Sequence, residues 1–135
     1  MTAKPLPEIR PESREFWDAA NRGELLFQKC DDCGKTQFYP RNYCTGCTSD
    51  KLSWVRSKGE GLVYTFTVVH RPPSAAFKPD VPYVIALVDL DEGFRMMMNV
   101  RGCPPEAVSI GARVRVIYET IPESEQKLPQ AELIR

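Results

Sequence analysis

The sequence has little of what most enzymes and membrane proteins require. It has one histidine, His70, and its 18 basic and 18 acidic residues cancel. A chain without net charge builds no long-range field, which disfavours non-specific binding of nucleic acid. No stretch approaches the ~20 apolar residues of a membrane helix, and the N-terminus lacks the apolar core of a signal peptide. We therefore expect a soluble, cytoplasmic protein with no membrane partner.

The common catalytic signatures are absent as well. The sequence contains no glycine-rich phosphate loop, no GxSxG turn and no paired-carboxylate motif. His70 has no neighbour in sequence that would orient it as a general base. Cys103 has only Arg101 as a basic neighbour, which favours a structural thiol over an activated one. We expect no catalytic residue in this chain when it is alone.

Four of the five cysteines form two CxxC pairs, Cys30-x2-Cys33 and Cys44-x2-Cys47. A CxxC turn lets two sulfurs approach one ion from a single backbone bend, and two such turns complete a tetrahedron. In a reducing cytosol this pattern indicates a metal site and not a pair of disulfides. Gly34 follows the first pair, at a position where such a turn commonly needs a positive φ.

A site closed by four thiolates leaves no position for water or substrate, so the sequence predicts one structural Zn²⁺. Iron is the alternative, because a tetrahedral sulfur site also suits a one-iron electron carrier. The two pairs lie closer together than in rubredoxins, which favours zinc.

A short helix is expected from about residue 11 to residue 22. Pro11 suits the first helical position and Gly23 is a plausible stop. Phe16 and Trp17 are adjacent, so their side chains point about 100° apart. We expect that both rings cannot easily bury against one small domain and that they mark a partner interface. The alternative is a helix in a groove between two domains that cover both rings.

The rest of the chain predicts a mostly β protein. Residues 62–69 alternate with period two and are rich in strand-forming residues, and four further segments have strand character. The expected strands are 62–69, 83–90, 94–100, 113–118 and a weaker 130–134, with a helical turn between the third and fourth. This pattern suits a five-stranded barrel of the OB type, with a β-sandwich as the alternative. We expect an N-terminal arm and helix (1–23), a rubredoxin-like four-cysteine zinc ribbon (24–58) and an OB-fold domain (59–135).

Two segments of the expected barrel have unusual compositions. Residues 70–82 contain four prolines and an apolar tip at Phe77, and long loops of this kind are often functional. In an OB fold this loop joins the first two strands, at a common ligand edge. In the run Met96-Met97-Met98, alternate members should face the barrel interior.

Taken together, these motifs resemble those of the zinc-ribbon/OB-fold family, long labelled a domain of unknown function, whose members partner thiolase-superfamily enzymes. The similarity covers nearly everything from residue 11 to residue 118. The matching residues are Phe16-Trp17, Gly23-x-Leu25, the two cysteine pairs with Gly34, Tyr39-Pro40-Arg41, Trp54, Gly59-x-Gly61, Thr65 to Val69, Val81-Pro82-Tyr83, Gly93 and Gly111 to Val114. The C-terminus departs from the family, because residues 128–131 lack the phenylalanine of its Pro-x-Phe segment.

The resemblance implies a non-catalytic accessory subunit that holds a thiolase, acyltransferase or aldolase partner and helps to bind coenzyme A (CoA) or acyl-CoA. A CoA site needs Lys or Arg beside an aromatic face. Arg41 with Tyr39 and Tyr43 is one candidate, and Arg71 with Phe77 is a second. The alternative function is binding of single-stranded nucleic acid, in which Tyr64 and Phe66 would stack on bases.

Overall fold

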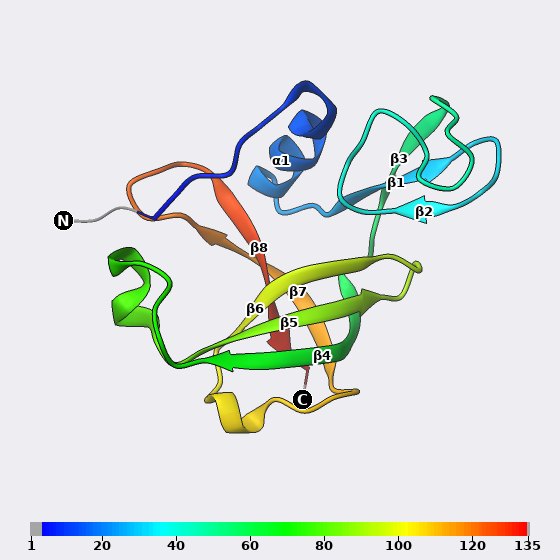
Figure 1. Ribbon diagram of the computed structural model, residues 1–135. Helices are drawn as coiled ribbons and strands as arrows, with labels where there is room; N and C mark the ends of the chain where they lie inside the picture. The colour runs from blue at the N-terminus through cyan, green and yellow to red at the C-terminus, as the bar shows by residue number, and fades with distance from the viewer. Residues whose placement is uncertain (1–3, 135) are drawn as a thin grey trace.

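The computed structural model of the protein describes residues 4–134, and Figure 1 shows a short helix and a small ribbon beside a β-barrel. Two helical segments begin the chain, the 3₁₀ turn Pro11–Ser13 and α1 (Arg14–Asn21). The ribbon strands are β1 (Leu26–Cys30), β2 (Thr36–Gln37) and β3 (Leu52–Arg56), in the order β2-β1-β3. The barrel strands are β4 (Glu60–Val69), β5 (Tyr83–Leu90), β6 (Arg95–Arg101), β7 (Arg113–Thr120) and β8 (Lys127–Leu133). No helix within residues 4–134 is long and apolar enough to cross a membrane.

The barrel closes in the order β4-β5-β6-β8-β7, and β7 pairs back onto β4. Only β6 and β8 run parallel to each other. This closure confirms the OB fold and rules out the β-sandwich. A 3₁₀ turn, Pro105–Ala107, lies between β6 and β7 as expected. The β4–β5 loop, expected to be irregular, contains a second 3₁₀ segment, Ala75–Asp80.

The core of the barrel is formed by every second side chain of its strands. In β5, side chains of every second residue are buried and the others are half-buried. In β6, Met96 and Met98 are buried whereas Met97 is 67% exposed, which confirms the expected alternation of the methionine run. Successive side chains of a strand point to opposite faces, so Met97 lies on the outer surface of the barrel.

Ribbon and barrel share one hydrophobic core. Phe27 of β1 stacks on Phe94, which precedes β6, with 4.5 Å between the ring centroids. Phe38 of the ribbon also contacts Phe94, at 6.0 Å. These contacts belong to the same cluster of buried residues as the barrel core. The expected division into arm and helix (1–23), ribbon (24–58) and OB-fold domain (59–135) stays a prediction.

The helix corrects one expectation. Phe16 is 2% exposed and Trp17 is 6% exposed, so both rings are covered, as in the alternative of a helix that lies in a groove between two domains. The helix lies between the ribbon and the barrel. Two side chains that point about 100° apart can therefore both pack against a neighbouring element. The Trp17 indole Nε1–H donates to the Tyr39 hydroxyl at 2.7 Å, and its ring meets Phe16 edge-on at 4.9 Å. That Phe16 and Trp17 mark a partner interface stays a prediction, but it can no longer rest on exposure of their rings.

Burial of Trp17 predicts a large cost of truncation. Trp17→Ala should lower the free energy of unfolding by about 3–5 kcal/mol, because it leaves a cavity between three elements. Tyr43→Ala is the matched control, since Tyr43 is 61% exposed and should change stability by only about 0.5 kcal/mol. Urea unfolding of the zinc-loaded proteins measures both. A Trp17→Ala protein as stable as the wild type would show that the helix does not belong to the core.

Candidate functional site

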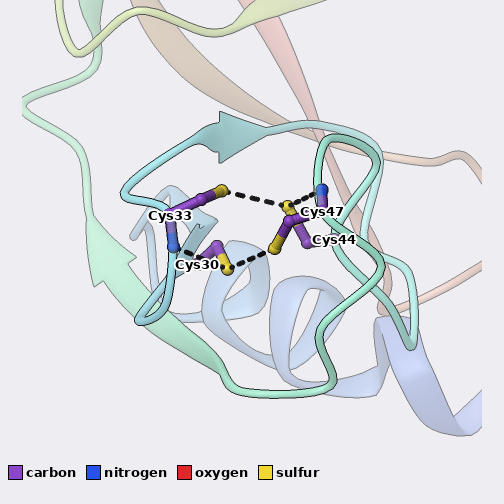
Figure 2. A group of neighbouring side chains, drawn as sticks. All are labelled: Cys30, Cys33, Cys44 and Cys47. Atoms are coloured by element: carbon purple, nitrogen blue, oxygen red, sulfur yellow. Dashed lines mark hydrogen bonds between the residues drawn. The ribbon is translucent and has the colours of Figure 1, made fainter.

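Two CxxC turns bring four cysteine side chains to one point, as Figure 2 shows. Cys30 ends β1 and Cys33 follows it, while Cys44 and Cys47 come from the segment between β2 and β3. All four sulfur atoms lie within 4.8 Å of one another. A tetrahedron with metal–sulfur distances of about 2.3 Å has edges of about 3.8 Å, and two of the sulfur pairs are 3.6 Å apart. The four cysteines are positioned to bind one metal ion.

The two turns have the same backbone geometry. The Gly34 N–H donates to the Cys30 carbonyl at 2.9 Å, and the Thr48 N–H donates to the Cys44 carbonyl at 3.0 Å. Gly34 has the expected positive φ of 79°. Thr48 has a φ of 65° in the corresponding position, where a β-branched residue is strained. The second turn therefore adopts the metal-binding conformation despite a local cost.

Backbone donors prepare one sulfur for the metal. The N–H groups of Cys47 and Gly46 lie 3.5 and 3.3 Å from the Cys44 sulfur. These two hydrogen bonds, the Cys47 one first, lower the pKa of the Cys44 thiol to about 6. The metal ligand is the thiolate, so a lowered pKa favours binding near neutral pH.

Three hollows that share lining residues form a groove, which begins between the helix, the ribbon and the barrel and follows β6 and β8 to the β4–β5 loop. Its helix–ribbon end is lined by Trp17, Tyr39 and Met96, among others, with a volume of about 260 Å³. Its middle, of about 270 Å³, lies over β5, β6 and the start of β8. Met97, Leu128 and Pro129 line both of these sections. Two adjoining sections of this size reach the range of about 300–1,000 Å³ that small-molecule sites occupy.

The groove continues into a narrower hollow of about 80 Å³ at the β4–β5 loop. This loop end shares Phe77, Tyr83 and Asn99 with the middle section. Lys4 of the N-terminal arm is one wall, with its ammonium 2.5 Å from the Asp80 carboxylate and 5.6 Å from the centre of the Phe77 ring. The arm therefore narrows this end of the groove.

The predicted CoA-binding residues do not form the two expected clusters. Tyr39 and Phe77 line opposite ends of the groove. Arg41 lies in a separate hollow together with Glu12, Glu15 and Asp50, whose carboxylates disfavour a phosphate. Neither Tyr43 nor Arg71 lines the groove, and both are exposed. The assignment of CoA contacts to these residues stays a prediction.

Sequence reasoning missed most of the groove. Tyr83, Met97, Leu128 and Pro129 were assigned no role, although the outward position of Met97 followed from the expected strand. The expectation that His70 and Cys103 are not catalytic stays a prediction. His70 is exposed and makes no side-chain hydrogen bond to another residue of 4–134, and Cys103 is half-buried.

Comparison with known proteins places this architecture in a family. Residues 17–53 match the domain described as "ChsH2, rubredoxin-like zinc ribbon domain", and residues 54–119 match "ChsH2, C-terminal OB-fold domain". The chain belongs to the DUF35 family of zinc-ribbon/OB-fold proteins, and its metal is zinc.

Relatives differ in length and in the roles their names give. A DUF35 domain-containing scaffold protein of Methanocaldococcus jannaschii is 36% identical over 100 residues, which are 73% of this chain and 70% of that protein. A probable enoyl-CoA hydratase alpha subunit of Thermomonospora curvata is 36% identical over 111 residues, which are 82% of this chain. The match covers only 34% of that subunit, so this chain corresponds to about a third of its length.

One solved structure is similar over nearly the whole chain. It is described as "Ltp2-ChsH2(DUF35) aldolase" and is 33% identical, with a TM-score of 0.84 over 95% of this chain and 98% of that chain. The name of that structure joins a DUF35 protein, ChsH2, to Ltp2 and calls the whole an aldolase. For the present chain this similarity supports both the fold and the zinc ribbon.

The zinc site gives a direct prediction. Cys44→Ser should lose the metal and unfold the ribbon, because structural zinc supplies on the order of 10 kcal/mol in small zinc-binding modules. Cys103→Ser, which changes the one cysteine outside the cluster, should keep one zinc per chain. Elemental analysis and thermal melting test both variants. A Cys44→Ser protein with full zinc content and unchanged melting would contradict the assignment.

Proposed function

We propose that this chain is a non-catalytic accessory subunit of an acyl-CoA enzyme complex. Its partner is a thiolase-superfamily subunit that acts as a thiolase, acyltransferase or aldolase. In this role the chain holds the partner and helps to bind CoA or acyl-CoA, while the partner supplies the nucleophile.

Two features of the structure carry this proposal. The metal site is closed, and the groove, as lined by residues 4–134, contains no arrangement of side chains that could catalyse a reaction. A zinc ion held by these four thiolates would have all four positions filled and could not activate water. The charged side chains that line the groove are held in ion pairs, Lys4 with Asp80 and Arg101 with Glu119. Within residues 4–134 we find no nucleophile and base at hydrogen-bond distance in this groove. Two relatives named as subunits of an enoyl-CoA hydratase and of a benzoylsuccinyl-CoA thiolase support an acyl-CoA substrate, and the solved structure named as an aldolase supports the aldolase alternative.

The alternative function, binding of single-stranded nucleic acid, has less support. The Arg95 guanidinium covers the Tyr64 ring at 3.7 Å from its centre, and Phe66 is half-buried. One face of the Tyr64 ring is therefore covered. Arg95 itself is paired with Asp89, and a chain without net charge builds no field that would attract a polyanion. A salt titration with single-stranded DNA should give no binding beyond weak, salt-sensitive association.

Affinity purification from the native cell tests the proposal at its core. The zinc-loaded chain should retain a thiolase-superfamily protein, identified by mass spectrometry. Recovery of nucleic acid or of single-stranded-DNA-processing proteins in place of an acyl-CoA enzyme would contradict the proposed function.

The proposal also predicts that the isolated chain has no turnover. Thiolysis, acyl transfer and retro-aldol cleavage of acyl-CoA substrates should all need the partner, because the chain has no activated nucleophile. The test is to assay the zinc-loaded chain alone and after addition of the co-purified partner. Turnover by the chain alone that His70→Ala or Cys103→Ala abolishes would show that it is itself the enzyme.

A further inference from the structure

We propose that a CoA-type ligand lies along the groove in one direction, with its nucleotide at the β4–β5 loop and its acyl group at the helix–ribbon end. This inference rests on the proposed function and adds the orientation of the ligand. Three sections of the groove differ in chemistry, and they follow the order of the three parts of acyl-CoA: a phosphate-bearing nucleotide, an amide-containing linker and an apolar acyl chain.

The loop end is the one charged section of the groove. It is lined by two cations, Lys4 and Arg101, and by their partners Asp80 and Glu119. Lys78, in the 3₁₀ segment between Phe77 and Asp80, is exposed and joins no ion pair within residues 4–134. The lining itself is balanced, with two cations and two anions, and Lys78 is a neighbouring cation outside it that can approach a bound phosphate.

The same end offers aromatic faces to a base. Phe77 and Tyr83 lie 6.2 Å apart, with their planes inclined at 39°. Rings of this kind stack on nucleobases, whose π faces are available whatever the base. Lys4 and Pro5 now narrow the hollow to about 80 Å³, so entry of a base requires the arm to move. The Lys4 ammonium can then exchange the Asp80 carboxylate for a ligand phosphate.

The middle of the groove contains an open strand edge. Pairing between β6 and β8 is confined, within the described chain, to Val100 and Arg101. The Asn99 N–H already points toward β8, where it donates to the Gln130 side chain at 2.8 Å. Backbone groups two residues apart in a strand face the same side, so those of Met97 face the gap between β6 and β8. Pro129, on the other side of the gap, has no N–H to offer.

An open strand edge suits a linker with amide groups. The pantetheine part of CoA has two amides in an extended chain, and the edge of β6 can pair with them as it would with a peptide. From Met97 to Asn99, before the pairing with β8 begins, the strand rises about 7 Å, at about 3.3 Å per residue. The linker can therefore run along β6 from the charged end toward Met97.

The helix–ribbon end has no charge. Every residue that lines it is apolar or aromatic, including Trp17, Phe38, Tyr39 and Met96. Its polar side-chain groups are the Tyr39 hydroxyl and the Trp17 indole N–H, and these two already pair with each other. Burial of an acyl chain against these groups is favourable, whereas burial of a phosphate is not. Charge and apolar surface thus assign opposite ends of the groove to opposite ends of the ligand.

Two ligand fragments and two pairs of variants test the orientation by calorimetry on the zinc-loaded chain. CoA has the nucleotide but no acyl chain, and octanoyl-pantetheine has the acyl chain but no nucleotide. Lys4→Ala should weaken CoA binding about tenfold, because a charge-assisted hydrogen bond is lost, and should leave octanoyl-pantetheine unaffected. Tyr39→Ala should weaken octanoyl-pantetheine about fivefold and leave CoA unaffected.

Matched controls separate these effects from general damage. Lys58→Ala and Tyr43→Ala change exposed residues that do not line the groove, and both should bind the two ligands as the wild type does. Melting and zinc content establish that each variant is folded. Lys78→Glu, on the exposed face of the loop, should repeat the loss of CoA binding without touching the packed arm.

The opposite selectivity of Lys4→Ala and Tyr39→Ala would overturn the orientation, as would equal losses of both ligands in folded variants. Loss of CoA binding on Arg41→Glu, with Lys4→Ala and Lys78→Glu unaffected, would move the nucleotide to the ribbon and also overturn it. A wild-type chain that binds neither ligand would contradict the proposed CoA contact itself, and the orientation with it.

Discussion

The stacking of Phe27 on Phe94 fixes the ribbon against the barrel, and the groove depends on that contact. The ribbon strands and the barrel strands belong to separate sheets, so no backbone ladder sets the distance between them. Aromatic rings hold them together, with Phe38 and the helix residue Phe16 extending the same cluster. Such pairs combine a large buried area with a preferred geometry. The helix–ribbon end of the groove is the surface left beside this cluster.

Zinc supports that contact from the ribbon side. The strand β2 has only two residues, and a sheet so small cannot bury enough apolar surface to fold by itself. Four thiolates on one ion fix the two turns and thus the direction of β1, from which Phe27 projects. The metal therefore acts on the groove through the fold and not through chemistry, in agreement with a closed coordination sphere.

Features set by local sequence could be predicted, whereas features set by packing between distant segments could not. The cysteine pairs, the positive φ of Gly34 and the strand pattern of the barrel each depend on a few neighbouring residues. The surroundings of Trp17 depend on Tyr39 and on Gln126, just before β8, which are more than 20 and more than 100 residues away. Arg41 was grouped with Tyr39 because they are close in sequence, but in an irregular segment neighbours can face different hollows.

Methyl NMR of the methionines during a titration with octanoyl-CoA tests the central claim, that this chain itself holds the ligand in the groove. Met97 is the exposed methionine at the junction of the middle and helix–ribbon sections. Its methyl signal should shift most, with smaller changes at Met96 and Met98, whose side chains lie in the core. A titration in which no methionine methyl signal moves, while the backbone amide signals of Arg41 and Tyr43 shift in a parallel amide spectrum, would place the ligand on the ribbon and contradict the account.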